Sequence, residues 1–159
     1  MADAAQNRRA ARVILIDDAG RVLLFRGGDP ARPEAATWWF TAGGGIDGDE
    51  SAHDAARREV REETGLVVGE LGPVVLERVI DFEMEGIRYH QEEVFFAVTV
   101  APFAVDEREW TDLERRIVEE HRWWTRAELA ASTETIFPEG LADLLDGIDR
   151  ARAGDPPRR

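Results

Sequence analysis

The sequence contains no cysteine, and this absence removes several kinds of chemistry at once. Without thiols the chain has no disulfide framework, no cysteine nucleophile and no cysteine-based zinc site. A reducing compartment fits such a composition, and we therefore expect a cytoplasmic protein.

Long hydrophobic runs are also missing. The N-terminal stretch MADAAQNRRAA lacks the apolar core of a secretory signal, and no run approaches the roughly 18 apolar residues of a membrane span. The sequence therefore predicts no membrane partner.

Positive charge is scarce relative to negative charge. The chain has 20 Lys and Arg against 33 Asp and Glu, which gives a formal net charge of −13. Proteins that bind the nucleic-acid backbone attract phosphates with an excess of basic residues, so we expect no nucleic-acid partner. A small nucleotide that arrives with a metal ion is still compatible with this charge.

The length of 159 residues suits one globular domain, and the chain shows no internal repeat. We predict a flexible N-terminal tail over residues 1–11, a folded domain over 12–150 and a flexible C-terminal tail over 151–159. Both proposed tails lack an apolar period.

Strand-like and helix-like segments alternate within the proposed domain, which predicts a mixed α/β fold. Two hairpins are expected, one from strands at 12–17 and 21–25 and one from strands at 73–84 and 87–100. Shorter strands are expected around 37–42 and at 121–125. Helices are expected at 50–64, at 126–132, and from Pro138 onward, where the proline suits a first helical turn.

The helix predicted from Glu50 to Thr64 has an unusual distribution of charge. Ser51 is placed to begin it and Gly65 to end it. Glu59, Glu62 and Glu63 fall within one arc of roughly 100°, because positions i, i+3 and i+4 share a face. Ala52, Ala55, Ala56 and Val60 lie on or beside the same arc, so these glutamates lie on the inward side of the helix.

A solvated surface helix would explain this cluster poorly. Glu59 and Glu63 are like charges at i and i+4, and only Arg58 with Glu62 has the favourable spacing. Partly buried carboxylates either raise one another's pKa or bind a cation. Clustered hard oxygen ligands suit Mg²⁺ or Mn²⁺.

The three glycines before this helix, Gly43, Gly44 and Gly45, read as a tight turn. Glycine lets the backbone approach a ligand or metal closely, and this turn leads directly into the carboxylate helix. We therefore predict that the two segments form one site.

The same residues resemble a known family pattern. Gly44, five residues, Glu50, seven residues and then Arg58-Glu59-Val60-Arg61-Glu62-Glu63-Thr64-Gly65-Leu66 match the Nudix box G-x5-E-x7-R-E-U-x-E-E-x-G-U, in which U is a bulky aliphatic residue. The flanks RVLLFRG, TWWFTAGGG and EEHRWWTRAEL are similar to the family as well. The loop proline of many relatives is replaced by Ala42, which implies a different loop shape with no lost ligand.

The resemblance implies an α/β/α sandwich around a mixed sheet and hydrolysis of a nucleoside diphosphate linked to a further group X. It also implies bound Mg²⁺ or Mn²⁺ and, as in many members, a homodimer. The metal ligands implied are Glu59, Glu62, Glu63 and the Gly44 carbonyl, with Arg58 orienting the glutamates and Glu50 supporting the loop. Substrate contacts are expected at Gly43, Gly44, Gly45, Trp39 and Arg26.

The general base is left open between two kinds of residue. Relatives use either a box glutamate, here Glu59 or Glu62, or a glutamate from a later loop. Glu120 is the expected later-loop residue, followed by Glu119, Glu92 and Glu93, and each of these could equally be a solvated charge. Rings expected either to stack on a base or to lie in the core are those of Trp38, Trp39, Phe82, Tyr89, Trp110, Trp123 and Trp124.

Substrate markers of several Nudix subgroups are missing. Residues 81–84 have neither the proline of ADP-ribose hydrolases nor the tyrosine of dinucleoside polyphosphate hydrolases. Oxidised or ordinary nucleoside triphosphates are therefore the favoured substrates, with ADP-ribose or another nucleotide sugar as the alternative. A non-catalytic sensor of nucleotides or ADP-ribose is the alternative of a different class.

Overall fold

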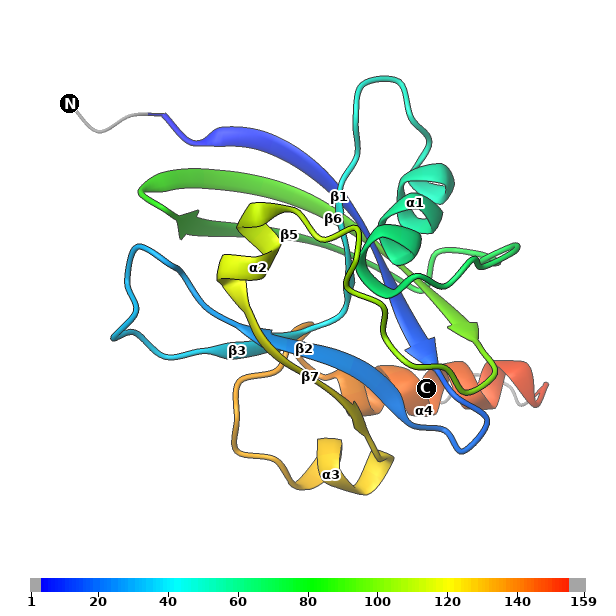
Figure 1. Cartoon of the computed structure of the whole chain (residues 1–159). Coiled ribbons are helices and arrows are strands. Elements are labelled where there is room, and N and C mark those ends of the chain that lie inside the picture. Colours follow the sequence, from blue (N-terminus) through cyan, green and yellow to red (C-terminus); the bar gives the residue numbers. More distant parts are fainter. Residues whose placement is uncertain (1–3, 155–159) are drawn as a thin grey trace.

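The computed structural model describes residues 4–154, and within them seven strands pair into one strongly curved sheet (Figure 1). Its main order is β3-β2-β1-β6-β5, with β4 also paired to β1 and β7 to β2. The strands are β1 (Gln6–Ile16), β2 (Val22–Gly27), β3 (Trp38–Phe40), β4 (Ala42–Gly45), β5 (Leu76–Met84), β6 (Ile87–Thr99) and β7 (Val118–Trp124). The helices are α1 (Ala52–Thr64), α2 (Asp112–Ile117), α3 (Arg126–Ala131) and α4 (Leu141–Arg152).

The central strand β1 makes the sheet mixed. It runs parallel to β6 along its whole length, from Gln6 opposite Tyr89 to Ile16 opposite Thr99, and antiparallel to β2 and β4. β5 and β6 form the predicted long hairpin, with the turn at Glu85 and Gly86.

Two hydrophobic clusters cover opposite faces of the sheet. On one side α1 buries Ala55, Ala56 and Val60 against Val13 and Phe96. On the other side α4 buries Leu141, Leu145 and Ile148 in the cluster that contains Trp39 and Trp124. Each fully buried leucine contributes about 2 kcal/mol through the loss of apolar surface. The predicted α/β class and helix–sheet–helix arrangement are confirmed.

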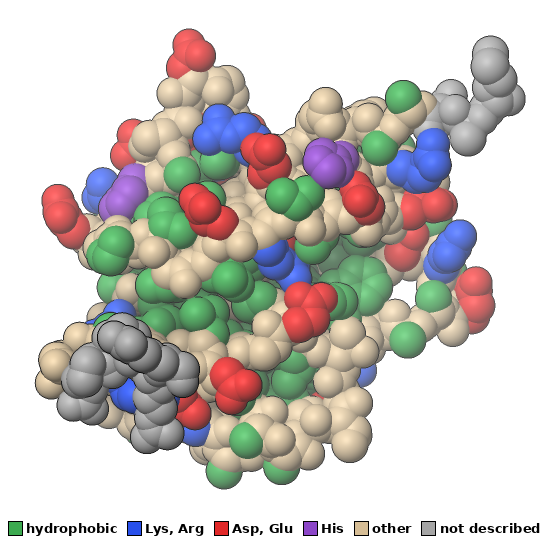
Figure 2. Space-filling view, turned by 180° about the vertical axis from the view of Figure 1, so that it is seen from behind, with side chains coloured by type: hydrophobic (Ala, Val, Ile, Leu, Met, Phe, Trp, Pro, Cys, Tyr) green, Lys and Arg blue, Asp and Glu red, His purple; other side chains and the backbone are tan. Residues whose placement is uncertain are grey.

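Seen from behind, hydrophobic side chains lie in a hollow across the middle of the molecule, and acidic and basic side chains surround it (Figure 2). Within residues 4–154, no helix combines the length and the apolar character needed to cross a membrane.

The predicted N-terminal tail, residues 1–11, extends too far into the chain. β1 begins at Gln6, and Ala10 and Ala11 are completely or almost completely buried. The sequence pattern missed the start of β1 because residues 6–11 are polar or small and show no apolar alternation. Backbone pairing with β6 and β4 places them in the sheet. The predicted C-terminal tail, 151–159, also begins too early, since α4 continues to Arg152; residues 1–3 and 155–159 lie outside the described part of the chain.

The glycine triplet is a strand and not a turn. Gly43, Gly44 and Gly45 belong to β4 and pair with Arg12, Ala11 and Ala10 of β1. At Gly43 the backbone φ is +137°, and a Cβ there would lie 2.4 Å from the Ala11 carbonyl oxygen. Glycine is needed here because β4 packs closely on β1, and the turn occurs at residues 46–51 instead.

Two further elements differ from the sequence prediction. The last helix starts after Gly140 rather than at Pro138, which follows a cis peptide bond. Helix α2 was not predicted, and it begins where the Thr111 hydroxyl accepts a hydrogen bond from the Glu114 backbone N–H. Such a short helix shows little periodicity in its sequence, so the capping residue Thr111 was the feature from which it could have been predicted.

Replacing Gly43 with alanine should destabilise the protein by about 1–3 kcal/mol, because the new Cβ would meet the β1 backbone at an unfavourable φ. Gly69→Ala is the matched control, since a Cβ there meets nothing within 4 Å. Urea unfolding of both variants measures the difference. Equal stability of the two variants would show that the close β1–β4 packing is not a constraint.

Candidate active site

Helix α1 has the caps expected from the sequence. The Ser51 hydroxyl accepts a hydrogen bond from the Asp54 N–H at 3.0 Å, and Gly65 ends the helix in the left-handed conformation with φ +79°. The intervening helix buries Ala55, Ala56 and Val60 on the sheet. This docking brings Glu59 and Glu63 to the side of the helix that faces β4, and Glu62 lies beside them in contact with Arg58.

The guanidinium of Arg58 connects the helix with the preceding loop. It donates to both carboxylate oxygens of Glu50 at 2.9 and 3.0 Å and to the Gly45 carbonyl at 3.0 Å. The same group donates to Glu59 at 3.0 Å and to Glu62 at 3.2 Å. Arg58 therefore fixes the positions of two carboxylates relative to β4 and the loop.

Glu59 and Glu63 are the more deeply placed of the three glutamates. Burial raises the pKa of Glu63 well above its ordinary value, although its carboxylate accepts the Gly43 N–H at 3.0 Å. Burial also raises the pKa of Glu59, and the charge of Arg58 only partly offsets this. The protein alone thus leaves a cluster of carboxyl groups with less cationic compensation than they require.

The donor groups of these residues suit a divalent cation. Gly44 lies directly against Glu59, because a Cβ at Gly44 would be 2.7 Å from the Glu59 carboxyl carbon. A backbone carbonyl and three carboxylates are the hard oxygen donors that Mg²⁺ and Mn²⁺ prefer. No group of three acidic or histidine side chains among residues 4–154 is already arranged around one point, since Glu59 and Glu62 turn toward Arg58.

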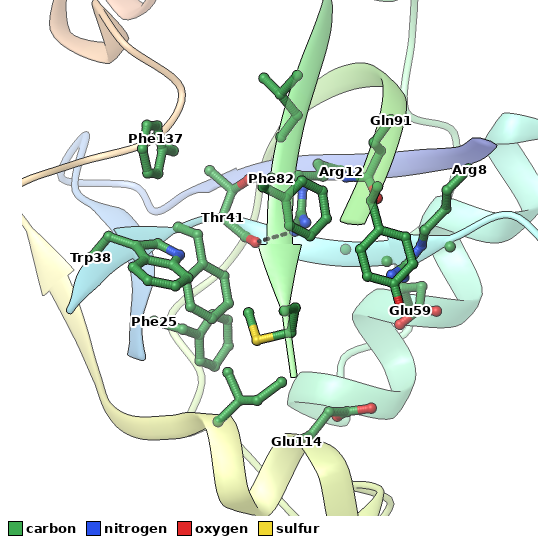
Figure 3. Close-up of a pocket in the computed structure, with 18 of the residues that line it drawn as sticks. Arg8, Arg12, Phe25, Trp38, Thr41, Glu59, Phe82, Gln91, Glu114 and Phe137 are labelled. Carbon is green, nitrogen blue, oxygen red and sulfur yellow. Dashed lines mark hydrogen bonds between the residues drawn. The ribbon is translucent and has the colours of Figure 1, made fainter. Parts of the chain in front are cut away.

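A cavity of about 670 Å³ opens beside this cluster (Figure 3). It lies between the β2–β3–β7 part of the sheet and the β1–β6–β5 part, and Gly43, Gly44, Gly45, Glu59 and Glu63 lie on its wall. The wall also carries aromatic rings, which come from Phe25, Trp38, Phe40, Phe82, Tyr89, Phe95, Trp110 and Phe137. Such a combination of flat apolar walls and a polar end suits a nucleotide-sized ligand.

Trp39 and Arg26, both predicted to contact substrate, lie on the face of the sheet away from the cavity. They are paired across β3 and β2, the Arg26 guanidinium is 5.8 Å from the Trp39 ring centre, and Trp39 is 2% exposed in the α4-side cluster. Strand alternation sends Trp38 to the cavity instead. The sequence indicated that the two tryptophans face opposite ways but not which one faces the substrate.

Glu120, predicted as the later-loop base, lies on that same far face. It is opposite Arg26 in the β2–β7 pairing and forms an ion pair with it at 3.0 Å. Of the secondary candidates, Glu119 and Glu92 are exposed, and Glu93 is buried in ion pairs with Arg12 and Arg78. None of these four glutamates lies on the cavity wall.

A different acidic residue, Glu114 of α2, lies at the cavity. It lies on the cavity wall with Glu59 and Glu63. Burial raises the pKa of Glu114, and the negative charge of Glu62 raises it further. The pattern Thr111-Asp112-Leu113-Glu114, a capping signature, was the one local signal that could have located it.

The rings considered for base stacking divide between cavity and core. Trp38, Phe82, Tyr89 and Trp110 lie on the cavity wall, and the Trp110 indole N–H donates to the Glu63 carbonyl at 2.7 Å. Trp39, Trp123 and Trp124 pack in the two hydrophobic clusters. Four of the seven rings considered from the sequence are therefore available at the cavity for stacking on a base.

Comparisons with known proteins agree with this architecture. A family model described as the NUDIX domain matches residues 6–145. The chain is 27% identical over 143 residues to the Nudix hydrolase YfcD of Salmonella typhi, covering 86% of this chain and 67% of that protein.

Solved structures show the same fold. The MutT protein from Methanosarcina mazei Go1 superposes with a TM-score of 0.66 at 20% identity, over 95% of this chain and 99% of that one. The Escherichia coli ORF135 protein gives a TM-score of 0.58 at 22% identity, over 97% and 96%. The fold, the site and the family match together define a pyrophosphohydrolase. The chain belongs to the Nudix family, whose domain spans most of its length.

Glu93 gives a pH-dependent prediction about stability. Burial would raise its pKa, but the charges of Arg12 and Arg78 outweigh this and hold the pKa below its ordinary value. Glu93 contributes stability above its unfolded pKa of about 4.3, and this contribution is lost as the pH falls through its folded pKa.

Glu93→Gln should therefore lower the free energy of unfolding at pH 7 by about 3 kcal/mol, and the deficit should shrink below about pH 4. Denaturant unfolding across pH 3–8 measures this deficit, with the exposed neighbour variant Glu92→Gln as control. A deficit that stays constant across this range would mean that the ion pairs are not its source.

Proposed function

We propose that the protein hydrolyses a diphosphate linkage in a nucleoside diphosphate-X compound, with Mg²⁺ or Mn²⁺, and favours oxidised or ordinary nucleoside triphosphates. The observation that carries this proposal is the position of Glu59 and Glu63 at the wall of a cavity that also bears aromatic rings. A nucleotide whose base lies among the rings would direct its phosphates toward these carboxylates. ADP-ribose or another nucleotide sugar is the alternative substrate.

Glu59, Glu62, Glu63 and the Gly44 carbonyl are the groups that would hold the metal. When bound, the ion neutralises phosphate oxygens and lowers the pKa of an attacking water. The protein keeps these ligands in place through Arg58, which holds Glu59 and Glu62, and through the Gly43 N–H, which holds Glu63.

The remaining chemical requirement is a base. Water attacks one phosphorus and its proton passes to a carboxylate. The bond from that phosphorus to the bridging oxygen breaks, and the other phosphate leaves with this oxygen and the bonding electron pair. Glu114 lies on the cavity wall with a raised pKa and is our preferred base; Glu59 and Glu62 are the alternatives from the helix. A base with a pKa nearer to neutrality accepts a proton more effectively than an ordinary surface carboxylate.

A small-molecule substrate follows from the family. A cytoplasmic location and a homodimer belong to the proposal, supported by the composition and by the resemblance to other Nudix proteins. Light scattering of the purified protein would determine the assembly state.

Glu62→Gln should lower kcat by a factor of about 10³ or more while leaving the fold intact, because one metal-ligating charge is lost. The measurement is phosphate or pyrophosphate release with Mg²⁺ and with Mn²⁺, across nucleoside triphosphates, ADP-ribose, dinucleotides and nucleotide sugars. Glu77→Gln, at an exposed position of β5, is the matched control. If the wild type turns over no compound but still binds a nucleotide in calorimetry, the alternative of a non-catalytic nucleotide or ADP-ribose sensor would be favoured.

Glu114→Gln and Glu120→Gln distinguish the two positions for a base. The Glu114 variant should lose about 10²–10⁴ in kcat, whereas the Glu120 variant should remain within about twofold of the wild type, because Glu120 lies across the sheet from the cavity. Steady-state kinetics on the best substrate of the panel measures both. Unchanged kcat in the Glu114 variant would mean that Glu114 is not the general base, and Glu59 or Glu62 would then be the candidates.

A further inference from the structure

The cavity contains buried polar atoms that the catalytic cluster does not use. Apart from Oε2 of Glu114, the proposed base, two side-chain atoms of the described cavity-wall residues are buried without a hydrogen-bond partner, Gln91 Oε1 and Thr41 Oγ1. Gln91 and Thr41 are each 1% exposed. Buried polar atoms are nearly always paired, so two unpaired ones at one cavity point to a ligand that completes them.

The orientation of the Gln91 amide is fixed by its neighbour. Gln91 Nε2 donates to Glu93 Oε2 at 3.0 Å. Arg12 and Arg78 also donate to this carboxylate, at 2.5 and 2.6 Å, and keep it ionised. An ionised carboxylate only accepts hydrogen bonds, so the amide must present its NH₂ group to Glu93. A flipped amide would place two acceptors in contact, and the free carbonyl is therefore the atom left for a ligand.

Thr41 is tied to the same network from the neighbouring strands. Arg12, whose Nε binds Glu93, also donates through Nη1 to the Thr41 carbonyl at 3.3 Å (Figure 3). One guanidinium thus holds the backbone of Thr41 and the partner of Gln91 in fixed relative positions. The Thr41 hydroxyl can donate or accept, while the Gln91 carbonyl can only accept.

The surroundings of these atoms suit the edge of a flat heterocycle. Tyr89, two residues before Gln91 on the same face of β6, stacks on Phe82 with ring centres 5.1 Å apart. Trp38 and Phe25 belong to the other wall of the cavity. A planar group between aromatic walls gains stacking on its faces and can hydrogen-bond only at its edge.

We propose that Gln91 is a specificity-determining residue whose carbonyl accepts an N–H from the edge of the nucleotide base, with the Thr41 hydroxyl pairing to a neighbouring base atom. This role rests on the proposed function, because it assumes that the base of the substrate occupies the ring-lined part of the cavity. A base with no N–H at that position leaves the Gln91 carbonyl buried and unpaired. The site therefore discriminates against such bases through the cost of an unsatisfied acceptor.

Metal-free calorimetry of AMP, GMP, CMP and UMP tests this role without turnover. The tightest binder is then compared with analogues in which each base N–H is removed or methylated in turn. For the wild type, one such change should weaken binding by about 10-fold or more. In Gln91→Met, which keeps the side-chain length and removes the amide, the same analogue should bind less than about twofold more weakly than the unmodified nucleotide.

Trp124→Phe is the matched control, because it alters another buried residue with an unpaired nitrogen, in the α4-side cluster and away from the cavity. It should keep the wild-type discrimination. Equal discrimination in Gln91→Met and the wild type would overturn the role of Gln91, as would no binding of any of the four nucleotides. If Gln91→Met fails to fold, the wild type still decides, since indifference to every base N–H contradicts the proposal.

The two proposals fail in different ways. Normal discrimination in the binding assay without hydrolysis by any metal-loaded sample would contradict the enzymatic proposal and leave Gln91 as a base-reading residue. Rapid hydrolysis that is indifferent to the base would leave the enzymatic proposal intact and contradict the role of Gln91.

Discussion

The contacts of one guanidinium, that of Arg58, set the geometry on which the site depends. It holds Glu50 and the Gly45 carbonyl on the loop side and Glu59 and Glu62 on the helix side. A planar group with five donors can make these bonds at once, whereas a lysine offers one compact charge. Without this junction Glu59 and Glu62 would lose the hydrogen bonds that hold them relative to β4 and the loop.

The second constraint is the close packing of β4 on β1. Because glycine at position 43 lets β4 approach the β1 backbone, its N–H reaches Glu63 and its neighbour Gly44 lies against Glu59. The cavity then extends from this junction to the aromatic walls between the two parts of the sheet. Buried ion pairs of Glu93 with Arg12 and Arg78 stabilise the far wall and orient Gln91. The proposed metal site and the proposed contact to the nucleotide base thus both depend on neighbouring parts of β1.

Local sequence was sufficient to predict the helix that carries the three glutamates. Ser51, Gly65 and the i, i+3, i+4 spacing of Glu59, Glu62 and Glu63 act within a few residues of one another, so helix geometry alone brings them together. The Nudix box adds the neighbouring loop for the same reason. The β5–β6 hairpin was also readable, since its strands and turn are contiguous.

Only the tertiary structure decided which distant residues join that helix. A strand pattern shows that Trp38 and Trp39 face opposite ways, but the register of β2, β3 and β7 determines that Trp38 reaches the cavity while Trp39, Arg26 and Glu120 do not. Glu114 and Gln91 enter the site through the packing of α2 and the parallel pairing of β1 with β6. The sequence by itself determined the chemical groups of the helix, because their spacing is local. The fold determined that Glu114, the proposed general base, and Gln91, the proposed contact to the nucleotide base, lie at the cavity, because their positions depend on contacts between segments far apart in the chain.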